Sequence, residues 1–178
     1  ENNVDWALSR DRYWGTPLPV WVCEQDSDHW HCVSSFAELN DLSGAVKDDF
    51  DPHRPQVDKI KFGCTVEGCA GRMSRVKQVI DCWFDSGAMP FAQYHWPFEN
   101  RTLVAEQFPA DFIAEGVDQT RGWFYTMHAI GVFLTIVDQD LWKSGELWGQ
   151  PLPRLDAGSS YRSVMVNGLL LDAEGRKM

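Results

Sequence analysis

The alternation of apolar and polar positions changes its period near residue 116. An apolar run, 112–114, is flanked by acidic residues and ends at Glu115-Gly116. Beyond Asp118, apolar residues recur at helical spacing: Trp123, Met127, Ile130 and Leu134. This pattern predicts a strand, a sharp glycine turn and a helix with an aspartate near its start. We expect the helix to continue to about residue 137.

The apolar run 162–171 is nearly continuous, which is typical of a parallel strand buried on both faces. Asn167-Gly168 interrupts this run, and the polar residues 172–176 predict a mobile turn. Residues 138–160 are rich in Trp, Pro and Gly and predict an insertion or a long loop. A strand, a helix and a second strand in this order indicate an α/β fold with a parallel sheet.

The first half of the chain carries shorter apolar runs. Residues 20–23 and 29–33 enclose a polar turn and predict a hairpin. Residues 60–64 and 71–76 enclose a second turn that contains cysteine. Together these runs predict a small β-rich subdomain over residues 20–78.

Two further features complete the pattern. A short helix is predicted from residue 36, capped by Ser34 or Ser35. Val79-Ile80 predicts a strand that continues through residues 82–84. We assign residues 1–19 and 79–178 to the α/β domain that surrounds the β-rich subdomain.

Composition narrows the class of protein. A chain of 178 residues makes one domain, or one domain with a small subdomain. The net charge of −10 argues against tight binding of nucleic acid by this chain, and no apolar run approaches the length of a membrane span. Five unevenly spaced cysteines indicate a reducing, cytoplasmic setting. Because the chain begins without Met and stops after Lys177-Met178, we interpret it as a piece of a larger protein.

The predicted glycine turn is also the first candidate site. In an open α/β sheet, ligands bind at the carboxyl ends of the strands, where Glu115, Asp118 and Gln119 are expected. Carboxylates there suit ribose hydroxyls, and Gly116 lets a ligand approach the backbone closely. The alternative is an ordinary helix cap on a surface turn.

The cysteines form a second candidate site. Tetrahedral zinc needs four ligands, and sulfur is a preferred donor. Cys23 and Cys32 would face each other across the hairpin, with Cys64 and Cys69 in the second turn. His29 and His31 are spare donors. The alternative is that the cysteines are small buried residues, which is also our interpretation of Cys82.

Four stretches, in chain order, resemble class I isoleucyl-tRNA synthetases. They are residues 9–17, 81–91, 111–123 and 166–178. The resemblance implies the second half of a Rossmann-type catalytic domain, after the inserted editing domain. Lys177-Met178 matches the start of the family's Lys-Met-Ser-Lys-Ser loop.

The resemblance implies a two-step reaction in the complete enzyme. Isoleucine and ATP, with Mg²⁺, form the aminoacyl adenylate, and the aminoacyl group then passes to tRNA. Catalysis comes from positioning and from donors around the phosphates, so no enzyme nucleophile is needed. We expect this chain alone to be inactive, because it carries half of the site.

The resemblance also assigns roles to residues of this chain. Lys177 is the implied catalytic residue, on a loop that closes over the phosphates. An apolar pocket separates isoleucine from valine only weakly, and isoleucyl enzymes are themselves the known example of that limit. Trp83 and Trp123 are implied to wall one amino-acid pocket together. The implied ATP-site residues are Glu115, Gly116, Asp118, Gln119, Asn167, Gly168 and Met178.

Two other classes of protein remain as alternatives. One is a stand-alone acidic binding module of zinc-ribbon type, and the other is a different α/β nucleotide-binding enzyme.

Two roles are open for Arg10 and Arg12. They would hold phosphate or the tRNA backbone, or else pair with local acids such as Asp5 and Asp11.

Overall fold

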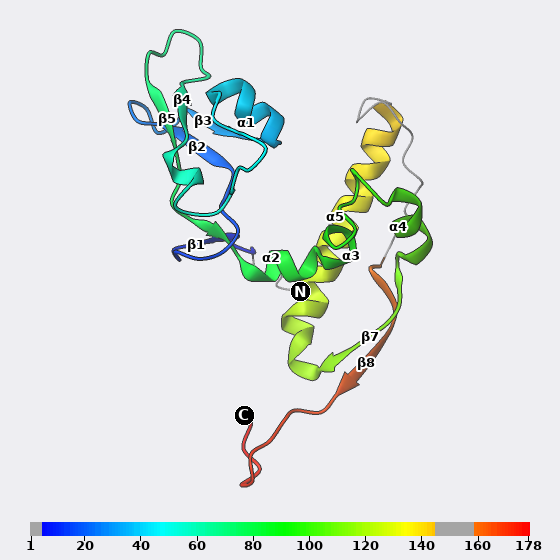
Figure 1. The fold of residues 1–178 in the computed structure, drawn as a ribbon. Coiled ribbons are helices and arrows are strands. Elements are labelled where there is room, and N and C mark those ends of the chain that lie inside the picture. Colours follow the sequence, from blue (N-terminus) through cyan, green and yellow to red (C-terminus); the bar gives the residue numbers. More distant parts are fainter. Residues whose placement is uncertain (1–4, 145–158) are drawn as a thin grey trace. The chain divides into compact units, whose positions relative to one another are not determined.

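The computed structural model describes residues 5–144 and 159–178, without the side chains of 135–144. The chain forms two compact units, Glu1–Cys82 and Trp83–Met178 (Figure 1). None of the helices in the described residues combines the length and the apolar character that a membrane crossing requires.

The first unit is built on a four-stranded antiparallel sheet with the order β3-β2-β5-β4. Both predicted strand pairs are therefore confirmed. Trp21, Phe62 and Met73 fill its core, and the indole N–H of Trp21 donates to the Ile60 carbonyl at 3.0 Å. The strands are β2 (Val20–Cys23), β3 (Trp30–Cys32), β4 (Lys61–Gly63) and β5 (Arg72–Arg75).

The helix of this unit, α1 (Phe36–Ser43), begins as its sequence predicts. The Ser35 hydroxyl accepts the backbone N–H of Glu38 at 3.1 Å, and the Glu38 carboxylate accepts the N–H of Ser34 at 2.6 Å. The helix ends at Gly44, whose φ of 65° is in the left-handed region that favours glycine. A short 3₁₀ turn, η1 (Val57–Lys59), precedes β4.

A second, two-stranded antiparallel pair joins β1 (Ser9–Arg10) to β6 (Val79–Ile80). Arg10 pairs with the buried Asp81 at 2.6 Å, so its acidic partner is distant in sequence. This corrects the expectation of local partners. The pairing joins β1 to the start of segment 79–178, with which the sequence had grouped residues 1–19.

The second unit contains the predicted strand, turn, helix and parallel strand. These are β7 (Ala110–Gly116), a 3₁₀ turn η2 (Val117–Arg121), α5 (Trp123–Ser144) and β8 (Tyr161–Asn167). Figure 1 shows α5 lying beside the β7–β8 pair. Phe124 and Met127 of α5 are buried and pack against Ile113 of β7.

Two expectations for this region are corrected. The helix α5 reaches Ser144, so residues 138–144 are helical and are not part of a loop, while 145–158 lie outside the described residues. The strand β8 is mostly exposed and is not buried on both faces. Among the described residues, β7 is the only strand paired with it.

Three short helices precede β7: α2 (Cys82–Gly87), α3 (Met89–Ala92) and α4 (Arg101–Gln107). The prediction that residues 82–84 continue the strand from Val79-Ile80 is wrong, because they open α2. Gly87 ends this helix against α5, where an added Cβ would lie 2.9 Å from the Thr126 backbone. The last residue of α2 therefore packs closely on α5. Cys82 is exposed and does not pack as expected.

Candidate functional site

The carboxyl ends of β7 and β8 meet at one edge of the parallel pair. Gly116, the last residue of β7, lies opposite Asn167, the last residue of β8, and Gly168 follows directly. The side chain of Glu115 is exposed beside them. The structure thus brings these four predicted residues to one sheet edge, which is where α/β proteins bind ligands.

The turn after β7 is folded back on this edge. The Asp118 carboxylate occupies the space beside Gly116, where an added Cβ would lie 2.6 Å from its Oδ1. The Gln119 amide nitrogen donates to Asp118 Oδ2 at 3.4 Å, and its Oε1 accepts the backbone N–H of Trp123 at 2.9 Å. Gln119 therefore caps α5, a role that the sequence had offered to Asp118.

The two candidate tryptophans both lie close to Gly122. The Trp123 indole N–H donates to the Ser86 carbonyl of α2 at 3.1 Å. The Trp83 ring lies 3.5 Å from where a Cβ on Gly122 would stand. The tight packing of α2 on the start of α5 thus brings together two residues that are 40 positions apart in the sequence.

A pocket of 410 Å³ opens beside β7, between α3 and α4. Glu115 and Trp123 line it together with apolar residues such as Met89 and Phe112. Trp83 is not among its lining residues and is 40% exposed. The helix α2 places Trp83 on the Gly122 side, and the expectation that the two indoles wall one cavity stays a prediction.

The last residues fold into a turn after β8. Leu171 and Lys177 form an antiparallel bridge, and the Asp172 carboxylate accepts the backbone N–H of Arg176 at 2.8 Å and that of Glu174 at 3.0 Å. The Arg176 N–H is the main cause of a lowered pKa at Asp172. Lys177 and Met178 are both exposed, so the Lys177 ammonium is available to a ligand.

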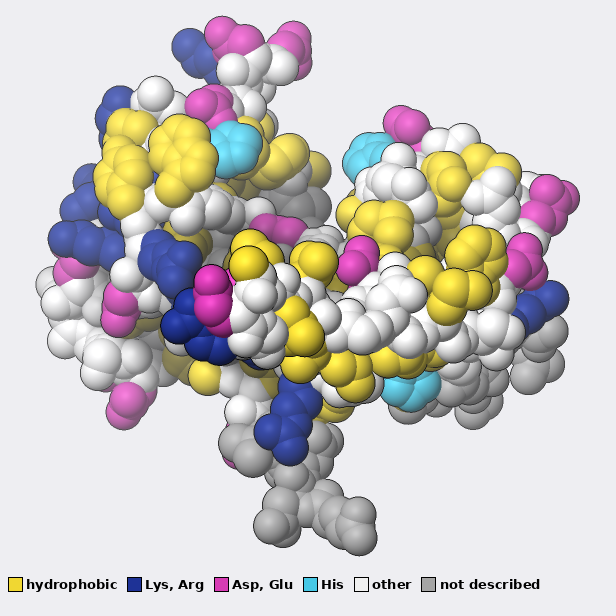
Figure 2. Space-filling model, turned by 90° about the horizontal axis from the view of Figure 1, so that it is seen from below, with side chains coloured by type: hydrophobic (Ala, Val, Ile, Leu, Met, Phe, Trp, Pro, Cys, Tyr) yellow, Lys and Arg dark blue, Asp and Glu magenta, His cyan; other side chains and the backbone are white. Residues whose placement is uncertain are grey.

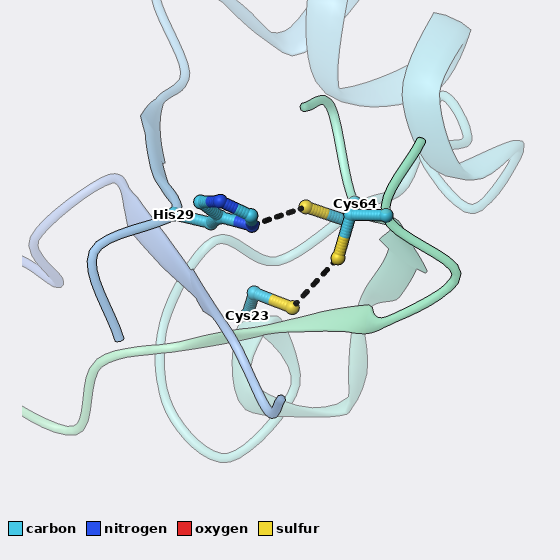
Figure 3. Close-up of side chains that lie close together, drawn as sticks. Cys23, His29 and Cys64 are labelled. Atoms are coloured by element: carbon cyan, nitrogen blue, oxygen red, sulfur yellow. Dashed lines mark hydrogen bonds between the residues drawn. The ribbon is translucent and has the colours of Figure 1, made fainter. Parts of the chain in front are cut away.

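The first unit holds a separate cluster of cysteine and histidine side chains, which are of the kinds that bind metals. Donor atoms of Cys23, His29, Cys64 and Cys69 all lie within 4.8 Å of one another. The Sγ atoms of Cys23 and Cys69 are 3.8 Å apart, and Cys64 Sγ is 3.6 Å from Nδ1 of His29. Figure 3 shows Cys23, His29 and Cys64 pointing toward one another from the ends of β2 and β4 and the start of β3.

The cluster corrects one predicted ligand: His29 replaces Cys32. In the β2–β3 register, Cys32 lies opposite Val20, at the far end of the hairpin, and is exposed. The Cys23 N–H donates to the His29 carbonyl at 2.9 Å, so the residue across from Cys23 is His29. The polar turn 24–28 contained this signal, because a turn of that length pairs its two flanking residues.

The surroundings of the cluster suit sulfur ligands. The pKa of the Cys23 thiol is lowered, first by the backbone N–H of Gln25 and also by that of Asp26. At Cys64 the backbone N–H of Val66 lowers the pKa, but burial and the neighbouring thiols outweigh it and the net pKa is raised. Gly71 borders the cluster, and an added Cβ there would overlap Cys23 Sγ. The fold thus leaves room at the sulfurs that only glycine permits.

Comparisons with known proteins identify relatives of this chain. The family described as "tRNA synthetases class I (I, L, M and V)" matches residues 1–178. The chain is 46% identical to isoleucine–tRNA ligase of Streptomyces avermitilis over 177 residues, which is 99% of this chain. It is also 46% identical to isoleucine–tRNA ligase of Thermus thermophilus over 179 residues. In both cases it spans 15% of the relative's length.

A solved structure supports the same assignment at the level of the fold. It is a ternary complex of Agrobacterium radiobacter K84 agnB2 LeuRS with tRNA and LeuAMS, which matches with a TM-score of 0.62 at 20% identity. The match covers 97% of this chain and 20% of that chain. Because the family match extends over every residue, the chain belongs to the class I tRNA synthetases of the I, L, M and V group.

Proposed function

We propose that this chain is part of an isoleucine–tRNA ligase that activates isoleucine with ATP and transfers it to tRNA. The observation that carries the proposal is the sheet edge where Gly116 lies opposite Asn167, with Glu115, Asp118 and Gln119 grouped around it. This edge occurs in a chain 46% identical to isoleucine–tRNA ligases. The same evidence favours a synthetase over a stand-alone binding module.

The residues of this edge divide into chemical roles. The carboxylates of Glu115 and Asp118 accept hydrogen bonds from ribose hydroxyls, and the absence of a side chain at Gly116 makes room for the Asp118 carboxylate. Lys177 stabilises negative charge on the phosphates, where ATP would carry Mg²⁺. Trp123 offers an apolar wall to the amino-acid side chain, from within the pocket beside β7.

The test of this assignment uses the full-length protein. Trp123→Ala is expected to raise the KM for isoleucine severalfold more than the KM for ATP, because it removes apolar contact to the amino acid. Trp30→Ala is the control, since it removes an exposed indole of the first unit. Equal changes of both KM values in Trp123→Ala would show that this residue supports the fold only.

We further propose that the first unit binds one zinc ion through Cys23, His29, Cys64 and Cys69. A tetrahedral site with Zn–S bonds of about 2.3 Å and a Zn–N bond of about 2.0 Å places two sulfurs about 3.8 Å apart and a sulfur and a nitrogen about 3.5 Å apart. In the structure the Cys23 and Cys69 sulfurs are 3.8 Å apart, Cys64 Sγ is 3.6 Å from Nδ1 of His29, and all four donors lie within 4.8 Å of one another. The thiolates and the imidazole suit zinc, and four protein ligands indicate a structural role.

Metal content tests the zinc proposal directly. Elemental analysis of the purified chain is expected to give close to one zinc per molecule, and Cys64→Ser is expected to lower that content strongly. Cys32→Ser is the matched control, because it changes an exposed cysteine of the same hairpin. Loss of zinc in both Cys32→Ser and Cys64→Ser, with none in His29→Ala, would restore the ligand set expected from the sequence. The five free thiols also favour a reducing, cytoplasmic setting.

A further inference from the structure

The turn between β2 and β3 contains a carboxylate directed at one of the cluster's side chains. Asp26 Oδ2 lies 3.5 Å from Nε2 of His29, while Nδ1 of the same ring faces Cys64 Sγ at 3.6 Å. We propose that Asp26 is a positioning residue for the metal centre, which holds the His29 ring so that Nδ1 binds the ion. This inference rests on the proposed zinc site and adds a residue to it.

The two ring nitrogens of a neutral histidine have different roles. One carries the proton and donates it, and the other offers its lone pair to a metal. A carboxylate beside Nε2 favours the proton on that nitrogen and leaves Nδ1 free as the ligand. Such outer partners fix the ring orientation and increase the basicity of the ligand, and their removal typically lowers metal affinity about 10–100-fold.

The turn holds the Asp26 carboxylate in place. Its Oδ1 accepts the backbone N–H of Asp28 at 2.9 Å, so Oδ2 remains for the imidazole. Its backbone carbonyl accepts the N–H of His29 at 3.2 Å, which ties the two residues together through the main chain as well. The backbone of Asp26 also serves the cluster, since its N–H acts on the Cys23 thiol. One five-residue turn therefore supports two of the four ligands.

The first experiment measures metal affinity in the 178-residue chain. Zinc binding is measured by competition with a chromophoric chelator, and the ligand set is read from the absorption spectrum of the Co²⁺-loaded chain. Asp26→Ala is expected to lower zinc affinity about 10–100-fold while the Co²⁺ spectrum keeps the form of three sulfurs and one nitrogen. Asp28→Ala is the matched control, because it removes a carboxylate from the same turn but keeps the N–H that Asp26 accepts.

The second experiment separates the effect on His29 from a general effect on the turn. In a His29→Cys background residue 29 has no ring N–H, so Asp26→Ala is expected to have little further effect on affinity. Nitrogen NMR of the zinc-loaded wild-type chain is expected to show the proton on Nε2 of His29. Asp26→Ala is expected to leave the proton on Nε2, which zinc on Nδ1 requires, and to shift the Nε2 and Hε2 resonances because the facing carboxylate is lost.

The outcomes distinguish this proposal from the zinc site itself. If the wild-type chain binds zinc with three sulfurs and one nitrogen but Asp26→Ala binds equally well, the role of Asp26 is overturned and the zinc site stands. An equal loss of affinity in the wild-type and His29→Cys backgrounds also overturns it, because Asp26 would then act through the turn. If the wild-type chain binds no zinc, both proposals fail.

Discussion

The Cys–His cluster of the first unit and the β7 turn of the second unit are both built where strands end, but they differ in completeness. The four donors of the cluster lie within 4.8 Å of one another. The carboxylates of the β7 turn, Glu115 and Asp118, are exposed. A metal ion needs a few donors around one point, which a single small unit supplies. A nucleotide needs a surface, and one strand end with its turn supplies only part of it.

The two regions share one structural device. In each, a glycine leaves the space that a functional side chain occupies. Gly71 makes room for the sulfur of Cys23, and an added Cβ at Gly122 would lie 2.7 Å from Oε1 of Gln119. Close approach of polar or sulfur atoms to the backbone is therefore a property of both sites, and the two sites differ in how complete their donor sets are.

Apolar residues are also exposed on the surface, as the hydrophobic side chains in Figure 2 show.

Metal removal is expected to produce the largest difference between the two regions. Structural zinc contributes about 10–16 kcal/mol in zinc-finger peptides at pH 7, so chelation should release the sheet that carries the ligands. Hydrogen exchange is expected to speed up in β2 and β5, while the buried positions of α5 keep their protection. Equal change in both units, or in neither, would contradict the idea that the cluster is a self-contained site.

Gly131→Ala is the matching perturbation of the second unit. An added Cβ would overlap the Ser160 hydroxyl and lie 3.2 Å from Phe108 Cζ. Overpacking of this kind costs about 1–3 kcal/mol, and urea denaturation of the second unit is expected to show that loss. Gly168→Ala is the control, because no atom lies within 4 Å of its added Cβ. Comparable losses in the two variants would show that the clash is relieved elsewhere.

Sequence reasoning succeeded where the structure depends on interactions between residues that are close in sequence. The Ser35 cap of α1 and the strand–turn–helix around Gly116 depend on neighbours in sequence, and both were confirmed. The prediction of a parallel strand at β8 was confirmed as well, since a nearly continuous apolar run is typical of such a strand. The sheet edge that forms the candidate site was therefore predictable.

The errors arose where register or distant packing decides. Cys32 was chosen as a ligand because cysteines look alike in a pattern, yet the hairpin register places His29 opposite Cys23. Residues 82–84 have strand-like composition, but they begin a helix whose last residue, Gly87, lies close to α5. Neither fact is contained in local composition. Hydrogen bonds such as that from Trp123 to Ser86 are likewise invisible in the sequence.

A smaller effect tests how the β7 turn is held. Gln119→Ala removes the acceptor for the Trp123 N–H, which acts as the cap of α5. Loss of such a cap costs about 1 kcal/mol of stability, measurable in the second unit by urea denaturation. Asp118→Ala is the control, since Asp118 does not cap the helix, and its stability is expected to stay close to that of the wild type. Greater destabilisation in Asp118→Ala would make Asp118 the structural residue and remove it from the nucleotide site.

The smallest expected effect is the pH dependence of unfolding free energy that Glu38 gives to the first unit. Hydrogen bonds from the Ser34 hydroxyl and N–H, and from His31, lower the pKa of Glu38 to about 2 from its ordinary 4.5. A lowered pKa in the folded state means that the stabilisation is complete above pH 4.5 and is lost as the pH falls toward 2. The difference in unfolding free energy between the wild type and Glu38→Gln is therefore expected to be constant near neutral pH and to shrink below pH 4.5. Glu67→Gln is the matched control, because it makes the same substitution at an exposed glutamate of the same unit. A difference that grows as the pH falls would contradict this sign, and the hydrogen bonds of Ser34 and His31 would then not favour the charged form of Glu38.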